Sequence, residues 1–155
     1  MSKMPVVFVG HGSPMNAIED NDYSRTWRGL AEKIPRPEVI ISLSAHWFTD
    51  GTKILNGEAP KTIYDMYGFP KELYEVTYNS PGSPKFAKIA RKLISKETEY
   101  DNSWGIDHGT WSVLVHMYPA RDIPVFQISI EAYAPPEAHY KIGRDLRSLR
   151  EKGAL

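Results

Sequence analysis

The sequence has no cysteine, no net charge and no long apolar run, and each absence excludes a class of function. Without cysteine there are no disulfide bonds, thiolate metal sites or cysteine nucleophiles, which leaves histidine, aspartate and glutamate as metal ligands. Basic and acidic residues each number 19, so no strong electric field would attract nucleic acid or an anionic membrane. The N-terminal apolar run covers only Val6 to Val9, too short for a signal peptide or a membrane span. We therefore expect a cytoplasmic protein that binds neither nucleic acid nor membrane.

Several catalytic motifs are also missing. The chain contains neither the GxSxG motif of serine hydrolases nor the HExxH motif of zinc proteases. The glycine-bracketed loop from Gly10 to Pro14 lacks the lysine and the spacing of a phosphate-binding loop and the glycine pattern of a dinucleotide-binding fold. These three function classes therefore have no support from the sequence.

The composition is that of a globular protein that buries a core. The chain has 155 residues, of which 41% are hydrophobic and 25% are charged, values near the average for folded domains. Single domains commonly have about 100–150 residues. We expect one domain over residues 1–155.

Buried strands are expected to alternate with helices. Short apolar, β-favouring runs predict strands at Val6–Val9, Val39–Ser44, Thr52–Leu55 and Val125–Ile130. Helical spacing with proline, serine or glycine at the ends predicts helices at Tyr23–Ile34, Pro84–Ile94, Trp111–Tyr118 and Pro136–Lys152. This alternation predicts an α/β fold with a mostly parallel or mixed sheet and helices on both faces. Ala154 and Leu155 stand where a further strand would begin, which predicts a fold truncated at that point.

Two histidines directly follow predicted buried strands. His11 lies just beyond Val6–Val9, and His46 lies just beyond Val39–Ser44. Ligand sites in parallel α/β sheets form beyond the carboxyl ends of the strands, so both imidazoles are expected at one end of the sheet. Two neutral imidazoles with one further nitrogen or oxygen donor suit a zinc, iron or copper ion that keeps an open coordination position. The alternative is that each histidine is incidental or structural.

A third histidine lies beside a carboxylate in a second glycine-containing loop. Asp107 and His108 could act as a ligand-orienting pair or as a proton-transfer group. Equally, Asp107 could cap a helix beside a hydrogen-bonded loop histidine. His116, within a predicted helix, is expected to be a partly buried packing residue.

Four blocks in sequence order resemble one enzyme family. These blocks are GHGSPM at residues 10–15, SAHW at 44–47, GIDHGTW at 105–111 and VHMYP at 115–119. Together they are similar to the DODA-type, or DOPA dioxygenase-like, class III extradiol ring-cleaving dioxygenases. The resemblance covers essentially the whole chain but only the N-terminal portion of a typical family member.

The resemblance implies an enzyme that opens the ring of a catechol with O2. It assigns metal binding to His11 and His46, places His108 in the active site as a catalytic residue, and implies Fe(II) as the metal, with zinc able to occupy the same ligands. It also implies that a further metal ligand and another active-site histidine lie in the C-terminal portion, without counterparts here. An aromatic diol and O2 are thus the expected partners, and the substrate-binding residues are not identified.

Three alternatives stay open at this point. The same fold includes Memo-like proteins, which act in protein interactions and not in catalysis. The chain could instead be a half-protein that needs a separately encoded C-terminal partner, or a homo-oligomer that associates through its open sheet edge. A zinc hydrolase would use the same histidines and would require a carboxylate near the metal-bound water, for which Asp107 is the candidate.

Overall fold

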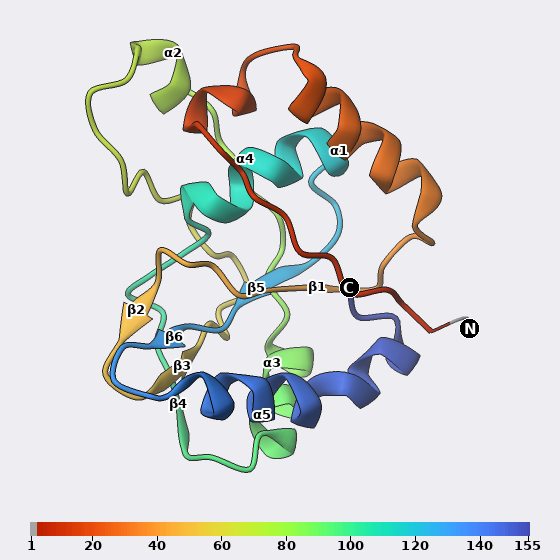
Figure 1. Cartoon of the computed structure of the whole chain (residues 1–155), viewed down its shortest axis with the longest axis vertical. Helices are drawn as coiled ribbons and strands as arrows, with labels where there is room; N and C mark the ends of the chain where they lie inside the picture. The colour runs from red at the N-terminus through yellow and green to blue at the C-terminus, as the bar shows by residue number, and fades with distance from the viewer. Residues whose placement is uncertain (1–2) are drawn as a thin grey trace.

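A mixed β-sheet separates two layers of helices (Figure 1). The computed structural model describes residues 3–155. The sheet is a layer of three short two-stranded pairs, each parallel: β1 (Ile40–Ser42) with β5 (Val125–Gln127), β2 (Phe48–Thr49) with β6 (Ile130–Glu131), and β3 (Thr52–Ile54) with β4 (Thr98–Tyr100). Ile54 and Ile128 form an antiparallel bridge, which joins β3 to the segment between β5 and β6. The expectation of a mixed sheet is confirmed.

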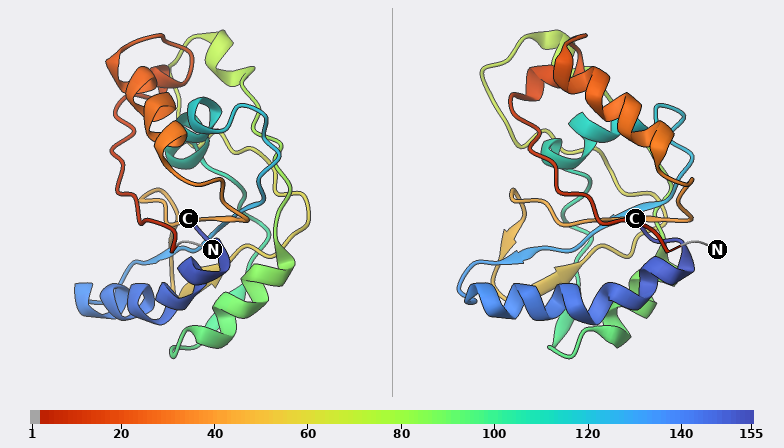
Figure 2. Two further views of the ribbon diagram at one scale, coloured as in Figure 1. Left: turned by 90° about the vertical axis from the view of Figure 1, so that its right-hand side faces the viewer. Right: turned by 45° about the vertical axis from the view of Figure 1, so that its right-hand side comes forward.

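Helices cover both faces of this sheet, as the alternation predicted (Figures 1 and 2). One layer holds the 3-10 helix η1 (Pro14–Ala17), α1 (Asp22–Lys33), α2 (Lys71–Tyr74) and α4 (His108–Met117). The other holds α3 (Pro84–Leu93), α5 (Pro136–Leu146) and the 3-10 helix η2 (Arg147–Lys152). Within the part of the chain that the structure describes, no helix combines the length and apolarity needed to cross a membrane.

Local capping explains where the helices begin and end. The Asn21 side chain accepts hydrogen bonds from the backbone amides of the first turn of α1, and Ser83 does the same for α3, whose first residue is Pro84. Gly153 ends η2 with a φ of +84°, and a Cβ there would lie only 2.5 Å from Cγ of Glu38. The helices predicted around residues 23–34, 84–94 and 136–152 are therefore confirmed.

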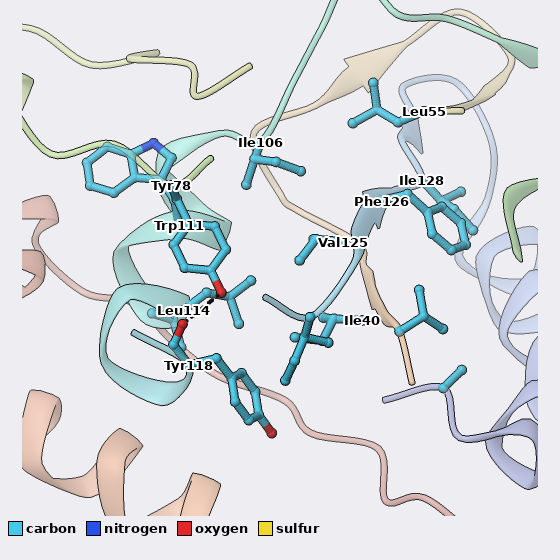
Figure 3. Close-up of a cluster of buried hydrophobic side chains, with 14 of the residues drawn as sticks. Ile40, Leu55, Tyr78, Ile106, Trp111, Leu114, Tyr118, Val125, Phe126 and Ile128 are labelled. Carbon is cyan, nitrogen blue, oxygen red and sulfur yellow. Dashed lines mark hydrogen bonds between the residues drawn. The ribbon is translucent and has the colours of Figure 1, made fainter. Parts of the chain in front are cut away.

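The core lies between α4 and the sheet (Figure 3). The side chains of Trp111, Leu114 and Val125 are all buried there, and Nε1 of Trp111 donates a hydrogen bond to the Ile63 carbonyl at 2.8 Å. The hydroxyl of buried Tyr78 donates a hydrogen bond to the Tyr118 carbonyl at 3.2 Å. Burial raises the pKa of Tyr78 well above its ordinary value, so the phenol stays protonated as the donor. This hydrogen bond thus fixes the C-terminal end of α4, which is the end opposite His108.

The predicted strand at Val6–Val9 is wrong. These residues are extended but belong to no strand, and the side chains of Val6 and Phe8 are 76% and 102% exposed. The physical reason is that a strand needs a neighbouring strand to satisfy its backbone, and the backbone of Val6–Val9 makes no hydrogen bond within the described chain. The sequence pattern also did not predict strands β2 and β4, the 3-10 helix η1 or the short helix α2.

Candidate metal centre

Three histidines from distant parts of the chain converge at one point. Nε2 of His11 lies 2.9 Å from Nε2 of His46. The ring of His108 lies 4.0 Å from that of His46 and 5.0 Å from that of His11, measured between centroids. One nitrogen from each ring can be chosen so that all three lie within 4.8 Å of one another. This spacing suits three ligands around one ion, because histidine–metal bonds are about 2.0–2.1 Å long.

His11 is held by the loop that follows it. Gly12 has a φ of +62°, and the Asn16 side chain donates a hydrogen bond to the His11 carbonyl at 3.0 Å. His116 fixes Asn16 in turn, since its Nε2 lies 2.8 Å from the Asn16 carbonyl and its Nδ1 lies 3.1 Å from a guanidinium nitrogen of Arg28. The arginine can only donate, which makes Nδ1 the acceptor and leaves the proton on Nε2. His116 is therefore more than a packing residue, because it ties α1 and α4 to the His11 loop.

His46 follows β1, and the N-terminal end of α4 packs directly against it. A Cβ added to Gly109 would lie 2.6 Å from Cδ2 of His46 and 2.8 Å from Oγ of Ser44. The sequence analysis placed His108 in a loop, but the structure shows it as the first residue of α4. Glycine at position 109 thus lets the helix bring His108 close to His46.

Asp65 lies behind two of the histidines and was not predicted. Its Oδ1 lies 2.9 Å from Nδ1 of His108 and accepts a hydrogen bond from the His108 backbone amide at 2.9 Å, while Oδ2 lies 3.8 Å from Nδ1 of His46. Burial raises the pKa of the Asp65 carboxyl, but the contacts from His108 outweigh burial and leave the pKa below its ordinary value. A carboxylate that contacts the far nitrogen of a metal-facing imidazole commonly orients the ring. A lone aspartate in the irregular segment 62–78 carries no spacing signal that could have revealed it.

Asp107 has a structural role in this geometry. Its buried carboxylate accepts hydrogen bonds from Oγ of Ser44 at 2.7 Å, Nε2 of Gln127 at 2.8 Å and Nε1 of Trp104 at 3.1 Å. Its side chain makes no capping bond to α4, although it occupies the capping position. Asp107 therefore joins the start of α4 to the ends of β1 and β5.

The donor set fits a metal ion. Burial lowers the pKa of His11, and the neighbouring His108 and His46 lower it further, which favours the neutral imidazole that binds metals. Nδ1 of His11 is buried and has no hydrogen-bond partner in the described chain. The His46 side chain is 31% exposed whereas that of His108 is 6% exposed, so the centre is approached from the His46 side.

Comparison with known proteins points to one family. Residues 3–154 match the family model described as the catalytic LigB subunit of aromatic ring-opening dioxygenase. Among curated proteins, the chain is 46% identical to the 4,5-DOPA dioxygenase extradiol of Escherichia coli K12 and 40% identical to that of Beta vulgaris. The alignments cover 99% and 96% of this chain, and 58% of each relative.

A solved structure agrees with these matches. The crystal structure of an uncharacterized protein from Escherichia coli K12 superposes with a TM-score of 0.75 at 41% sequence identity. The superposition covers 92% of this chain and 54% of that one. The chain thus spans somewhat more than half the length of the proteins it matches.

Proposed function

Because this chain belongs to the family of the catalytic LigB subunit of aromatic ring-opening dioxygenases, we propose that it provides the metal-binding part of an extradiol dioxygenase. The proposed reaction cleaves the ring of a DOPA-like catechol beside its two hydroxyl groups and adds both atoms of O2, giving a ring-opened semialdehyde. The convergence of His11, His46 and His108 carries this proposal. The alignment covers 58% of the Escherichia coli relative, so we propose the activity for the whole enzyme, of which this chain forms the metal-binding part.

In this proposal His11 and His46 bind one Fe(II) ion. Their Nε2 atoms face each other, and neutral imidazole is a good ligand for iron as well as for zinc. When bound, Fe(II) would act as a Lewis acid for the two catechol oxygens and would activate O2 for attack on the ring. We also propose that the protein works in the cytoplasm, because a reducing compartment keeps the iron as Fe(II).

His108 then acts as the acid–base residue for the catechol. Asp65 lies at Nδ1 of His108 and favours a proton on that nitrogen, which leaves Nε2 free to accept a proton from a catechol hydroxyl. The same contact orients the ring toward His46, and the low exposure of His108 keeps bulk water away from the transferred proton. Asp65 is a positioning residue in this scheme, because it acts through the imidazoles.

Catechol binding tests the proposal on the chain as it stands. The chain is loaded anaerobically with Fe(II) and titrated with 4-nitrocatechol, whose visible absorption shifts when its oxygens lose their protons and bind a metal. We expect the shift in the wild type and its loss in His46→Ala. The matched control is His139→Ala, because His139 lies on α5, on the other face of the sheet. An unshifted spectrum in the wild type would contradict the proposal and favour a Memo-like interaction protein.

The zinc hydrolase alternative loses its main candidate residue. A hydrolase needs a carboxylate free to take a proton from the metal-bound water. Both oxygens of Asp107 already accept hydrogen bonds from other side chains, and Asp65 lies behind the imidazole rings at their Nδ1 atoms. The arrangement of the two carboxylates therefore favours oxygenase over hydrolase chemistry.

A further inference from the structure

Asn56 and Gly57 are the one Asn-Gly pair in the sequence, a context in which asparagine deamidates readily. The backbone nitrogen of the glycine can attack the side-chain amide carbon of the asparagine, because glycine has no side chain to hinder the approach. The attack closes a succinimide ring, which water opens to aspartate or isoaspartate. In the folded chain, the contacts of Asn56 and Gly57 decide whether this reaction occurs.

One side chain, that of Asn102, holds both groups that would react. Its Oδ1 accepts hydrogen bonds from the backbone amides of Asn56 and Gly57, each at 3.0 Å. Its Nδ2 donates to Oδ1 of Asn56 at 2.8 Å. Backbone amides only donate, so the carbonyl oxygen of the Asn102 side chain must face them and its amino group must face Asn56. The Asn102 side chain thus clamps the attacking nitrogen and the amide that it would attack.

The fold brings Asn102 to this place. Strands β3 and β4 lie side by side, and their parallel register pairs Ile54 with Tyr100 (Figure 1). The same register, continued along both chains, sets Asn56 beside Asn102. The Asp101 amide extends the pairing by donating to the Ile54 carbonyl at 3.1 Å. The clamp is therefore a product of strand pairing.

We propose that Asn56 is a latent self-modification site, which the Asn102 side chain keeps from deamidating while the chain is folded. In the reaction, a bond forms between the Gly57 nitrogen and Cγ of Asn56, and the bond from Cγ to Nδ2 breaks. The departing amino group leaves as ammonia with the proton that the Gly57 nitrogen loses. Water then adds across either of the ring's carbonyl–nitrogen bonds and leaves a carboxyl group. No oxidant, metal or enzyme takes part.

The clamp opposes both requirements of ring closure. The Gly57 nitrogen must release its proton, which now lies in a hydrogen bond to Oδ1 of Asn102. Cγ of Asn56 must turn toward that nitrogen, which would pull Oδ1 of Asn56 away from Nδ2 of Asn102. A typical hydrogen bond changes an equilibrium by about 2- to 10-fold, so loss of all three should accelerate deamidation at least about tenfold.

The isoaspartate product would disturb the start of α3. Isoaspartate routes the main chain through the former side-chain carbon, which lengthens it by a methylene group and displaces the Gly57 carbonyl. That carbonyl packs tightly on Gly82, where an added Cβ would overlap its oxygen. Gly82 precedes Ser83, whose side chain caps α3. Deamidation should therefore lower the free energy of unfolding, and Asn102 protects the fold by preventing it.

Ageing of the purified protein tests the proposal without metal or substrate, so its outcome is independent of the proposed function. Wild type and Asn102→Ala are incubated at mildly alkaline pH, and peptide mass spectrometry follows the conversion of Asn56. We expect Asn102→Ala to lose the Asn56 amide at least about tenfold faster than the folded wild type. Asn102→Asp keeps an acceptor for the Gly57 amide, so its rate should lie between those two.

A rescue variant and an internal reference separate the clamp from a general loss of stability. Gly57 has no positive φ, and a Cβ there meets nothing nearer than 3.4 Å, so Gly57→Ala added to Asn102→Ala should fold and return Asn56 to the slow rate. Asn79, which precedes Ser80, should deamidate at the same rate in every variant, because it lies outside the clamp. The proposal is overturned if Asn56 reacts equally fast in wild type and Asn102→Ala, or if Asn79 accelerates together with Asn56.

Discussion

Replacing Asp65 with asparagine should weaken metal binding while leaving the fold intact. Asparagine has nearly the same shape but no charge, so the carboxylate contacts at 2.9 Å to His108 and 3.8 Å to His46 lose their electrostatic part. Removing such a ligand-orienting carboxylate typically costs about 10–100-fold in metal affinity, or about 1.4–2.7 kcal/mol. The expected change is therefore large enough to measure by titration.

The assay is anaerobic isothermal titration of Fe(II), repeated with Zn(II), into wild type and Asp65→Asn. Asp122→Asn is the matched control, because Asp122 is exposed and pairs with Arg36 away from the three histidines. Circular dichroism and thermal unfolding establish that each variant is folded. If Asp65→Asn binds both metals as tightly as the wild type, the role assigned to Asp65 is wrong.

Four further predictions follow from the same contacts. Gly109→Ala should weaken metal binding, because the new Cβ would lie 2.6 Å from Cδ2 of His46. Gly143→Ala in α5 is the control: its Cβ meets nothing within 4 Å, so it should raise the free energy of unfolding by about 0.5–1 kcal/mol. His116→Phe should lower both stability, by about 1–3 kcal/mol, and metal affinity, because the Asn16 carbonyl loses its donor; unchanged titration and melting curves would contradict this. Trp111→Ala should cost about 3–5 kcal/mol in urea unfolding, with Trp111→Phe milder, since Trp111 is fully buried; equal losses would count against it. The 155-residue chain alone, given Fe(II), O2 and a catechol, should form no yellow semialdehyde, and robust turnover would refute the need for a C-terminal segment.

Part of the candidate metal centre could be predicted from local patterns. His46 follows strand β1, as predicted, whereas His108 was expected in a loop and begins α4 instead. Only the resemblance to the dioxygenase family indicated an active-site position for His108. His11 was predicted from the end of an expected strand at Val6–Val9, although that strand does not form. The run from Val6 to Val9 has the composition of a buried strand, yet it is unpaired because burial depends on a neighbour that composition cannot reveal.

The residues that support the histidines could not be found in this way. Asp65 lies in a segment without helical or strand periodicity and reaches His108 only through the tertiary fold. His116 does have helical spacing, but its two hydrogen bonds cross to α1 and to the His11 loop, which no periodicity encodes. Contacts between distant segments depend on packing, and a single sequence shows packing only where it leaves a regular pattern.

If His11 and His46 bind one metal ion together, each of them is needed for a bound ion, which metal stoichiometry measures. Wild type, His11→Ala, His46→Ala and His139→Ala are each dialysed anaerobically against Fe(II), and bound iron is measured by mass spectrometry. We expect one ion per chain in the wild type and in His139→Ala, and loss of that ion in each of the other two variants. Full iron retention in either His11→Ala or His46→Ala would contradict it.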